Sequence, residues 1–341
     1  FAPPFATPIV AAGGLPVVTA ADLLRLLAVP AFGWIALRDY RTRRVPKRAW
    51  YPVVAIGAVA LALDVAAVSG PFETRIFRLR VALSLALAPL GYLFYRVGAF
   101  GAADAKAVAT LAVLFPTYPA YELAGTALPL VASNVGVFSL TVLTDGVLAG
   151  AAYPLALGVR NALAGRVSPA MFVARPVRRS DLLSTHGTLL GGGSGLSLSG
   201  LDLDALRMYL RWRGVALADL CANPGAFRDP ASLPTETNPP TGGAVDPGLD
   251  PDPGAAADAE TRRDGSADDP WGAAAFLDSI DGSAYGTDAE TLRAGLDRIA
   301  EREAVWVSPG LPFLVPLFVG LLVALTYGDV LFGVVRALGL V

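Results

Sequence analysis

Long apolar runs with very few charged side chains constrain this sequence more than any other feature. The six blocks run over 16–38, 51–70, 81–95, 102–118, 123–159 and 304–328. A helix needs about 20 mostly apolar residues to cross the roughly 30 Å hydrocarbon core of a bilayer. Charged residues make up 16% of the chain, whereas soluble globular chains have about 25%. The sequence therefore predicts an all-α, polytopic integral membrane protein with about six transmembrane helices.

The pattern of hydropathy divides the chain into three parts. Residues 1–159 hold five apolar blocks, 304–341 hold the last transmembrane helix, and 160–303 form a polar insert between them. Helical spacing inside the insert predicts one helix over 201–217. A second is predicted over 287–303, because its first threonine and a glutamate three residues later match a capping box.

The middle of the insert is strongly acidic. Between Asp229 and Glu290 there are 14 carboxylates and two arginines, together with many Pro and Gly residues. Such a composition buries too little apolar surface to offset the entropy of the chain. We therefore expect residues 222–270 to be disordered.

Basic side chains predict the orientation in the membrane, because cytoplasmic loops carry an excess of Lys and Arg. The residues that follow the first block are Arg41, Arg43, Arg44, Lys47 and Arg48, and those that follow the fifth are Arg160, Arg166, Arg175, Arg178 and Arg179. The loop over 117–122 has none, whereas the arginines over 71–80 oppose the pattern. On balance the insert is expected in the cytoplasm, both chain ends outside, and the protein in the cell membrane.

Two carboxylates are notable for their positions. Asp39 ends the first block and Asp104 lies near the start of the fourth, so both are expected at the cytoplasmic boundary of the membrane. A charge there is costly unless it is hydrated, paired or functional. Two carboxyls in a partly dry site cannot both ionise easily, and such a pair can supply a general base and a general acid. The alternative is that Asp39 pairs with a nearby arginine and Asp104 with Lys106.

Local motifs favour the catalytic interpretation. Small residues surround the second carboxylate in Phe100-Gly101-Ala102-Ala103-Asp104-Ala105-Lys106, and the first begins the stretch Asp39-Tyr-Arg-Thr-Arg-Arg-Val-Pro46. These segments resemble the GxGD signature and the first catalytic aspartate of the type IV prepilin and archaeal preflagellin peptidases. The resemblance implies a membrane aspartic endopeptidase with Asp39 and Asp104 as catalytic residues, supported by Gly101, Ala102, Ala103 and Lys106. It also implies prepilin-like or preflagellin-like precursors as substrates, cleaved after a basic leader at the cytoplasmic face.

The sequence departs from the family pattern in two ways. Ala103 replaces the second glycine of GxGD, which keeps a small residue beside the aspartate. The four-cysteine zinc loop of the bacterial enzymes, which also methylate the new N-terminus, has no counterpart, because Cys221 is the only cysteine. We therefore expect no methyltransferase activity, no metal and no cofactor. No nucleic-acid-binding motif is present.

Other polar residues carry weaker hypotheses. Asp145 lies deep in the fifth block, where an ionisable residue is a functional candidate, but it is expected to be protonated and hydrogen-bonded to Thr141 or Thr144. Asp64 and His186 are interpreted as structural and solvated, respectively. The main alternative function is a transporter or channel that uses intramembrane aspartates as a proton or ion relay. A presenilin-like intramembrane protease is a third, although its two aspartates would lie deeper and in later spans.

Overall fold

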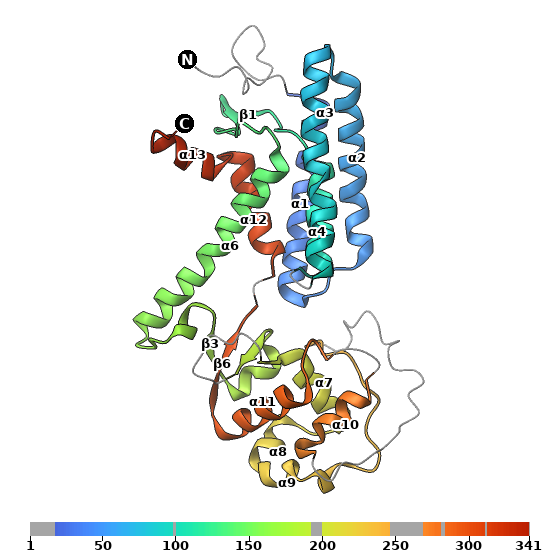
Figure 1. Cartoon of the computed structure of the whole chain (residues 1–341), viewed down its shortest axis with the longest axis vertical. Helices are drawn as coiled ribbons and strands as arrows, with labels where there is room; N and C mark the ends of the chain where they lie inside the picture. The colour runs from blue at the N-terminus through green and yellow to red at the C-terminus, as the bar shows by residue number, and fades with distance from the viewer. Residues whose placement is uncertain are drawn as a thin grey trace. The chain divides into compact units, whose positions relative to one another are not determined.

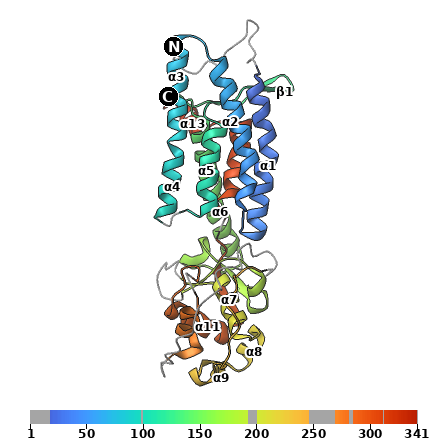
Figure 2. The same cartoon turned by 90° about the vertical axis from the view of Figure 1, so that its right-hand side faces the viewer.

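The computed structural model describes residues 18–97, 100–191, 200–245, 269–280, 284–310 and 312–340 (Figures 1 and 2). The chain folds into two compact units. The first consists of Phe1–Tyr153 with Leu311–Val341, and the second is Pro154–Gly310.

The first unit is a helical bundle. Its elements are α1 (Ala20–Thr42), η1 (Lys47–Ala49), α2 (Trp50–Ala67), α3 (Pro71–Leu85), α4 (Leu87–Arg96), α5 (Ala102–Leu114), β1 (Tyr121–Leu123), β2 (Thr126–Leu128), the first part of α6 (Phe138–Leu163), α12 (Leu314–Thr326) and α13 (Val330–Ala337). Within the described residues, four segments are long and apolar enough to cross a membrane: Ala20–Thr42, Lys47–Ala67, Pro71–Arg96 and Phe138–Leu163. The prediction of a helical membrane protein is confirmed.

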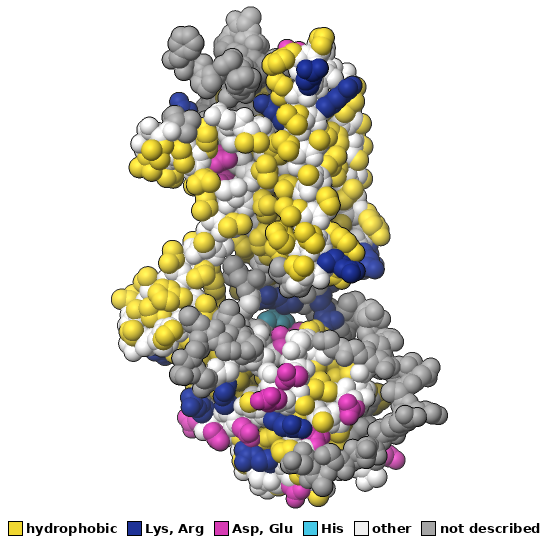
Figure 3. Space-filling model, viewed as in Figure 1, with side chains coloured by type: hydrophobic (Ala, Val, Ile, Leu, Met, Phe, Trp, Pro, Cys, Tyr) yellow, Lys and Arg dark blue, Asp and Glu magenta, His cyan; other side chains and the backbone are white. Residues whose placement is uncertain are grey.

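The outer surface of this bundle is apolar between two basic ends. Figure 3 shows hydrophobic side chains covering the face made by α2, α3 and α4, with Lys and Arg gathered at either end of that face. Large aliphatic and aromatic residues of these helices are more than half exposed, including Tyr51, Phe72 and Leu79. Such a surface suits contact with acyl chains rather than with water.

The third membrane segment starts earlier than the apolar block over 81–95 predicts. Gly70 has a positive φ (+90°), which glycine adopts readily, and Pro71 occupies the first helical turn, so α3 begins there. Proline is well suited to that position because its missing N–H would have no helical partner. The arginines over 71–80, expected in a loop, therefore lie on α3.

The last two apolar blocks are only partly helical. The stretch over 123–137 contains the β1–β2 hairpin, and α6 begins at Phe138. Residues Ala304–Ser308 form strand β6, and α12 begins only at Leu314, so the expected last transmembrane helix over 304–341 is shorter. Both α5 and α12 have 13 residues, which corresponds to about 20 Å of helix.

Glycines allow the bundle helices to approach closely. A Cβ atom on Gly320 of α12 would collide with the backbone nitrogen of Gly146 in α6, and one on Gly57 of α2 would lie 3.0 Å from the Cα of Leu114 in α5. Small residues at such contacts are typical of membrane helices, which gain stability from close packing.

The second unit combines a small sheet with short helices. Its elements are η2 (Pro169–Phe172), β3 (Arg175–Arg178), η3 (Arg179–Ser184), β4 (Thr188–Leu190), β5 (Gly200–Asp202), α7 (Leu203–Arg213), α8 (Leu217–Ala222), α9 (Pro224–Arg228), η4 (Pro230–Ser232), η7 (Pro270–Gly272), α10 (Ala273–Asp278), α11 (Ala289–Glu301) and β6. The four strands pair antiparallel in the order β3-β6-β4-β5.

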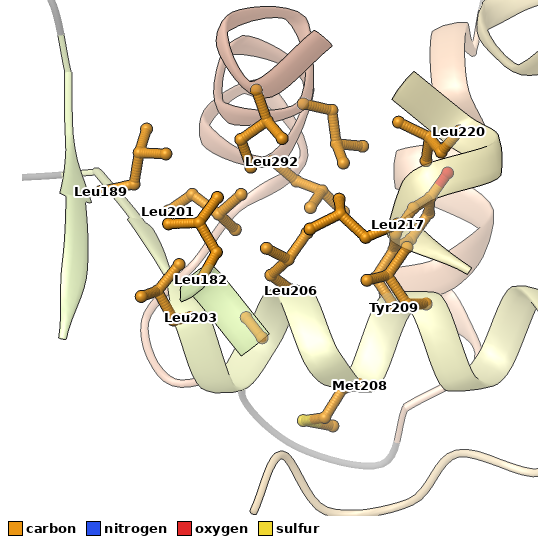
Figure 4. Packing of buried hydrophobic residues seen from close by; sticks show 14 of the residues in the cluster. Leu182, Leu189, Leu201, Leu203, Leu206, Met208, Tyr209, Leu217, Leu220 and Leu292 are labelled. Atoms are coloured by element: carbon orange, nitrogen blue, oxygen red, sulfur yellow. The ribbon is translucent and has the colours of Figure 1, made fainter. Parts of the chain in front are cut away.

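Leucine is the commonest residue in the buried core of this unit, called the leucine core below. Figure 4 shows Leu201 and Leu203 near β5 and Leu206 of α7 lying toward Leu292 of α11. The two helices predicted in the insert are present as α7 and α11. The cap of α11 differs from the prediction: Asp288, not Thr287, accepts a hydrogen bond from the N–H of Thr291 (2.7 Å).

Part of the segment expected to be disordered is folded. Residues 222–245 include α9 and η4, and Phe227 and Leu233 pack against the leucine core. The prediction was wrong there because two well-placed apolar side chains outweigh an average acidic composition. The acidic residues 246–268 lie outside the described part of the chain.

Candidate active site

Helices α1 and α5 run in opposite directions, as contacts at their two ends show. At one end, the Nε–H of Arg25 donates to the carbonyl oxygen of Leu114 (2.7 Å), joining the start of α1 to the end of α5. At the other end lie Asp39, in the last turn of α1, and Asp104, in the first turn of α5. The antiparallel arrangement therefore brings the two aspartates to the same end of the bundle.

Asp39 is almost completely buried. Its relative exposure is 6%, and its backbone carbonyl accepts the N–H of Arg43 (2.8 Å) at the end of α1. Arg43 itself is left-handed (φ 54°), which ends the helix and turns the chain into the basic stretch. A carboxyl at this place is removed from bulk water and lies beside a cation.

Asp104 is held by the glycine of its motif. The N–H of Gly101 donates to Asp104 Oδ2 (3.0 Å), so the carboxylate caps its own helix. A Cβ at Gly101 would lie only 3.2 Å from that oxygen. The adjacent Phe100 stacks on Phe313 with ring centroids 5.1 Å apart, which anchors the turn. The small residues of the motif thus leave room for the carboxylate and fix its direction.

The two carboxylates share one electrostatic environment. Asp39 and Asp104 are close enough to repel each other, and the guanidinium of Arg43 attracts both. Within the described residues, Lys106 makes no ion pair with Asp104, so this part of the simple pairing alternative is not seen. The arrangement can hold two interacting carboxyl groups beside one cation.

Two other intramembrane aspartates have structural partners. Asp64 forms a buried ion pair with Arg25, which agrees with the structural interpretation. Asp145 accepts a hydrogen bond from the N–H of Val330 (3.1 Å) and not from Thr141 or Thr144, so its predicted partners were wrong. Thr141 instead donates to Asp329 Oδ2 (3.0 Å). Sequence reasoning missed Asp329, and its place in a Tyr-Gly-Asp turn after an apolar helix was the available signal.

The single histidine and cysteine belong to the second unit. His186 Nδ1 lies 3.8 Å from Asp204 Oδ1. Its side chain is 19% exposed, which is less than expected for the solvated loop residue predicted from the sequence. Cys221 is half-buried, and burial raises the pKa of its thiol. In the part of the chain that the structure describes, no group of three or more His, Cys, Asp or Glu side chains could hold a metal ion.

Two family models match the chain. The model of the type IV leader peptidase family matches residues 26–155, a range that contains Asp39 and Asp104. The model described as archaeal peptidase A24 C-terminus type II matches residues 277–330, which include α11, β6 and α12. Together they cover more than half of the chain. The chain belongs to the type IV leader peptidase family.

This membership decides between the functional classes that the sequence left open. A leader peptidase acts on precursor proteins, so the family supports a membrane protease of archaeal type over a transporter or channel. No curated protein matches the chain. The family matches cover the bundle and the C-terminal part, but leave residues 156–276 of the insert unmatched.

Proposed function

We propose that this chain is an aspartic endopeptidase that removes the basic leader from prepilin-like or preflagellin-like precursors. The observation that supports it best is the meeting of Asp39 and Asp104 at one end of the antiparallel helices α1 and α5, beside Arg43. Both residues lie inside the range that the leader peptidase model matches.

The two aspartates have different roles in this mechanism. Asp104 lies in the first turn of α5, where the helix dipole and the N–H of Gly101 favour the anion. Asp39 lies in the last turn of α1, where the dipole is negative and where burial disfavours a charge. Asp104 is therefore the base that takes a proton from the attacking water. Asp39 is the acid that gives a proton to the leaving amine as the peptide bond breaks.

The site is proposed to face the cytoplasm. The strongly basic stretch 41–48 follows α1 directly, on the side where Asp39 lies, and Lys and Arg are retained in cytoplasmic loops. A precursor with a basic leader and an apolar helix would present its scissile bond at this boundary. The product is expected without N-terminal methylation, because the four-cysteine loop of the bacterial enzymes has no counterpart in this sequence.

The proposal is tested with Asp39→Asn and Asp104→Asn in membranes that also contain tagged precursors. Asn has nearly the same shape but cannot act as an acid or a base, so each change should lower the cleavage rate at least 100-fold at an unchanged protein level. Two variants outside the bundle are the controls and should keep near-normal cleavage: Asp219→Asn, the same change at an exposed position of α8, and His186→Ala. Substantial cleavage by either catalytic variant would contradict the aspartic mechanism.

A further inference from the structure

The last helix of the chain leaves the bundle sideways. The chain turns at Gly328 (φ +97°) after α12, and α13 then runs across the direction of α2 and α3 (Figure 1). The turn is held by residue Val131, whose carbonyl accepts the N–H of Asp329 (3.0 Å) and whose N–H donates to the carbonyl of Tyr327 (2.8 Å). The change of direction is thus tied to the rest of the unit by hydrogen bonds.

Two buried carboxylates hold the start of α13. Asp329 is its N-cap and accepts the N–H of Phe332 (2.8 Å). Asp145 of α6 accepts the N–H of Val330 (3.1 Å). Their relative exposures are 8% and 3%. Because the free N–H groups of a helix start favour anions, Asp145 fastens α13 to α6.

The sides of α13 differ in polarity. Leu331, Val334 and Leu338 follow the i, i+3, i+7 spacing of one helix face, and their exposures are 52%, 51% and 68%. Gly333 is buried against Tyr327 on the inner side. Arg336 is exposed and lies about 140° around the helix from Leu331, at 100° per residue.

We propose that α13 is an interfacial helix that lies in the plane of the membrane, at the boundary between lipid headgroups and acyl chains. Its apolar face would meet the chains, and Arg336 would reach the phosphates of the headgroups. With eight residues, or about 12 Å, α13 cannot cross the bilayer.

The surroundings of α13 indicate that lipid, rather than another protein, covers its apolar face. The exposed apolar residues of α13 belong to the same compact unit as helices that are long and apolar enough to span a membrane. Tyr327, at the junction of α12 and α13, is 40% exposed, and tyrosine is enriched at the membrane–water boundary. The junction lies at the end of the bundle opposite Asp39, since α12 starts beside Phe100 and runs away from it.

Site-directed labelling of the whole chain in nanodiscs tests this proposal. In a Cys221→Ser background, single cysteines at Val334→Cys, Leu338→Cys and Arg336→Cys carry an environment-sensitive fluorophore. Labels at 334 and 338 should be quenched at least threefold more by shallow spin-labelled lipids than the label at 336, and aqueous iodide should show the reverse order. Equal iodide quenching at all three positions would overturn the proposal.

Two further measurements separate the remaining explanations. Labels at 334 and 338 that resist both quenchers, and lose this protection on dilution to one chain per nanodisc, would assign the face to a second copy and overturn the proposal. Asp145→Ala should at least halve the contrast between positions 334 and 336, because α13 loses its attachment to α6. An unchanged contrast would show that Asp145 does not set the orientation.

Discussion

Arg25 offers the sharpest test of how the bundle aligns its two aspartates. The side chain is 1% exposed, donates from Nε to the carbonyl of Leu114, and forms ion pairs with Asp22 (3.4 Å) and Asp64. These partners belong to α1, α2 and α5. Arg25→Ala would leave a buried carboxylate and a carbonyl without their donor.

The expected loss is large because the contact is buried. Removing one partner of a buried ion pair costs about 3–5 kcal/mol, which is roughly two to three and a half orders of magnitude in the unfolding equilibrium. Arg25→Lys should lose less, since it keeps the charge but not the Nε–H bond to Leu114. Arg48→Ala, at an exposed position, is the control and should stay within about 0.5 kcal/mol.

Unfolding by increasing SDS in mixed micelles, followed by tryptophan fluorescence, measures this difference. Leader cleavage by the same samples should also fall, because a looser contact between α1 and α5 lets Asp39 move relative to Asp104. The double variant Arg25→Met/Asp64→Leu should recover much of the stability, since apolar replacement of a buried ion pair is often neutral. A loss below about 1 kcal/mol for Arg25→Ala would refute the reasoning, because it would mean that the ion pair is hydrated.

Three further predictions concern orientation, pH and the insert. A reporter fused after Arg179 should lie in the cytoplasm and one fused near Tyr118 outside; the same side for both would contradict the proposed orientation. Burial raises the pKa of Asp202 to about 6. The folded second unit therefore favours the protonated carboxyl: the free energy of unfolding is highest below about pH 4 and falls as the pH rises to about 6. Asp202→Asn should therefore slow hydrogen exchange of the α7 amides at pH 7 but not at pH 4, and equal effects would contradict this. Deleting 246–268 should leave cleavage unchanged; loss of cleavage in the deletion would show that the acidic segment acts at the site. Asp269→Ala removes a carboxylate that accepts the N–H groups of two α10 residues. It should therefore lower the free energy of unfolding of the second unit by about 1–2 kcal/mol.

The candidate site was predictable because its residues occupy positions that local sequence defines. Asp39 follows the last residue of one apolar block and Asp104 lies near the first residue of another, and Gly101 three residues before Asp104 is a local signal for a capped helix. The partner of Arg25 was not predictable in this way. Leu114 lies 89 residues away and contributes a backbone carbonyl, which leaves no trace in its side-chain type.

The incorrect helix boundaries arise from what hydropathy measures. An apolar stretch indicates burial in lipid or in a core, but both helices and strands can satisfy it. In Ala304–Ser308, Val305 and Val307 are buried at alternate positions of a strand. Because the residues between them are uncharged too, the sequence does not show this alternation between buried and exposed positions. The same ambiguity explains why the hairpin before α6 was assigned to a span.

The acidic insert shows that average composition can also predict too little structure. Its average composition predicts disorder, yet single contacts decide the fold of 222–245. Arg228 pairs with Asp297 of α11, and the indole N–H of Trp271 donates to the same carboxylate (2.9 Å). Because one aspartate on α11 binds both flanks of the acidic segment, the ends of that segment are held by the folded unit whatever the composition between them. An acidic linker can therefore vary in length without unfolding the unit, whereas a change of Asp297 would release both flanks together.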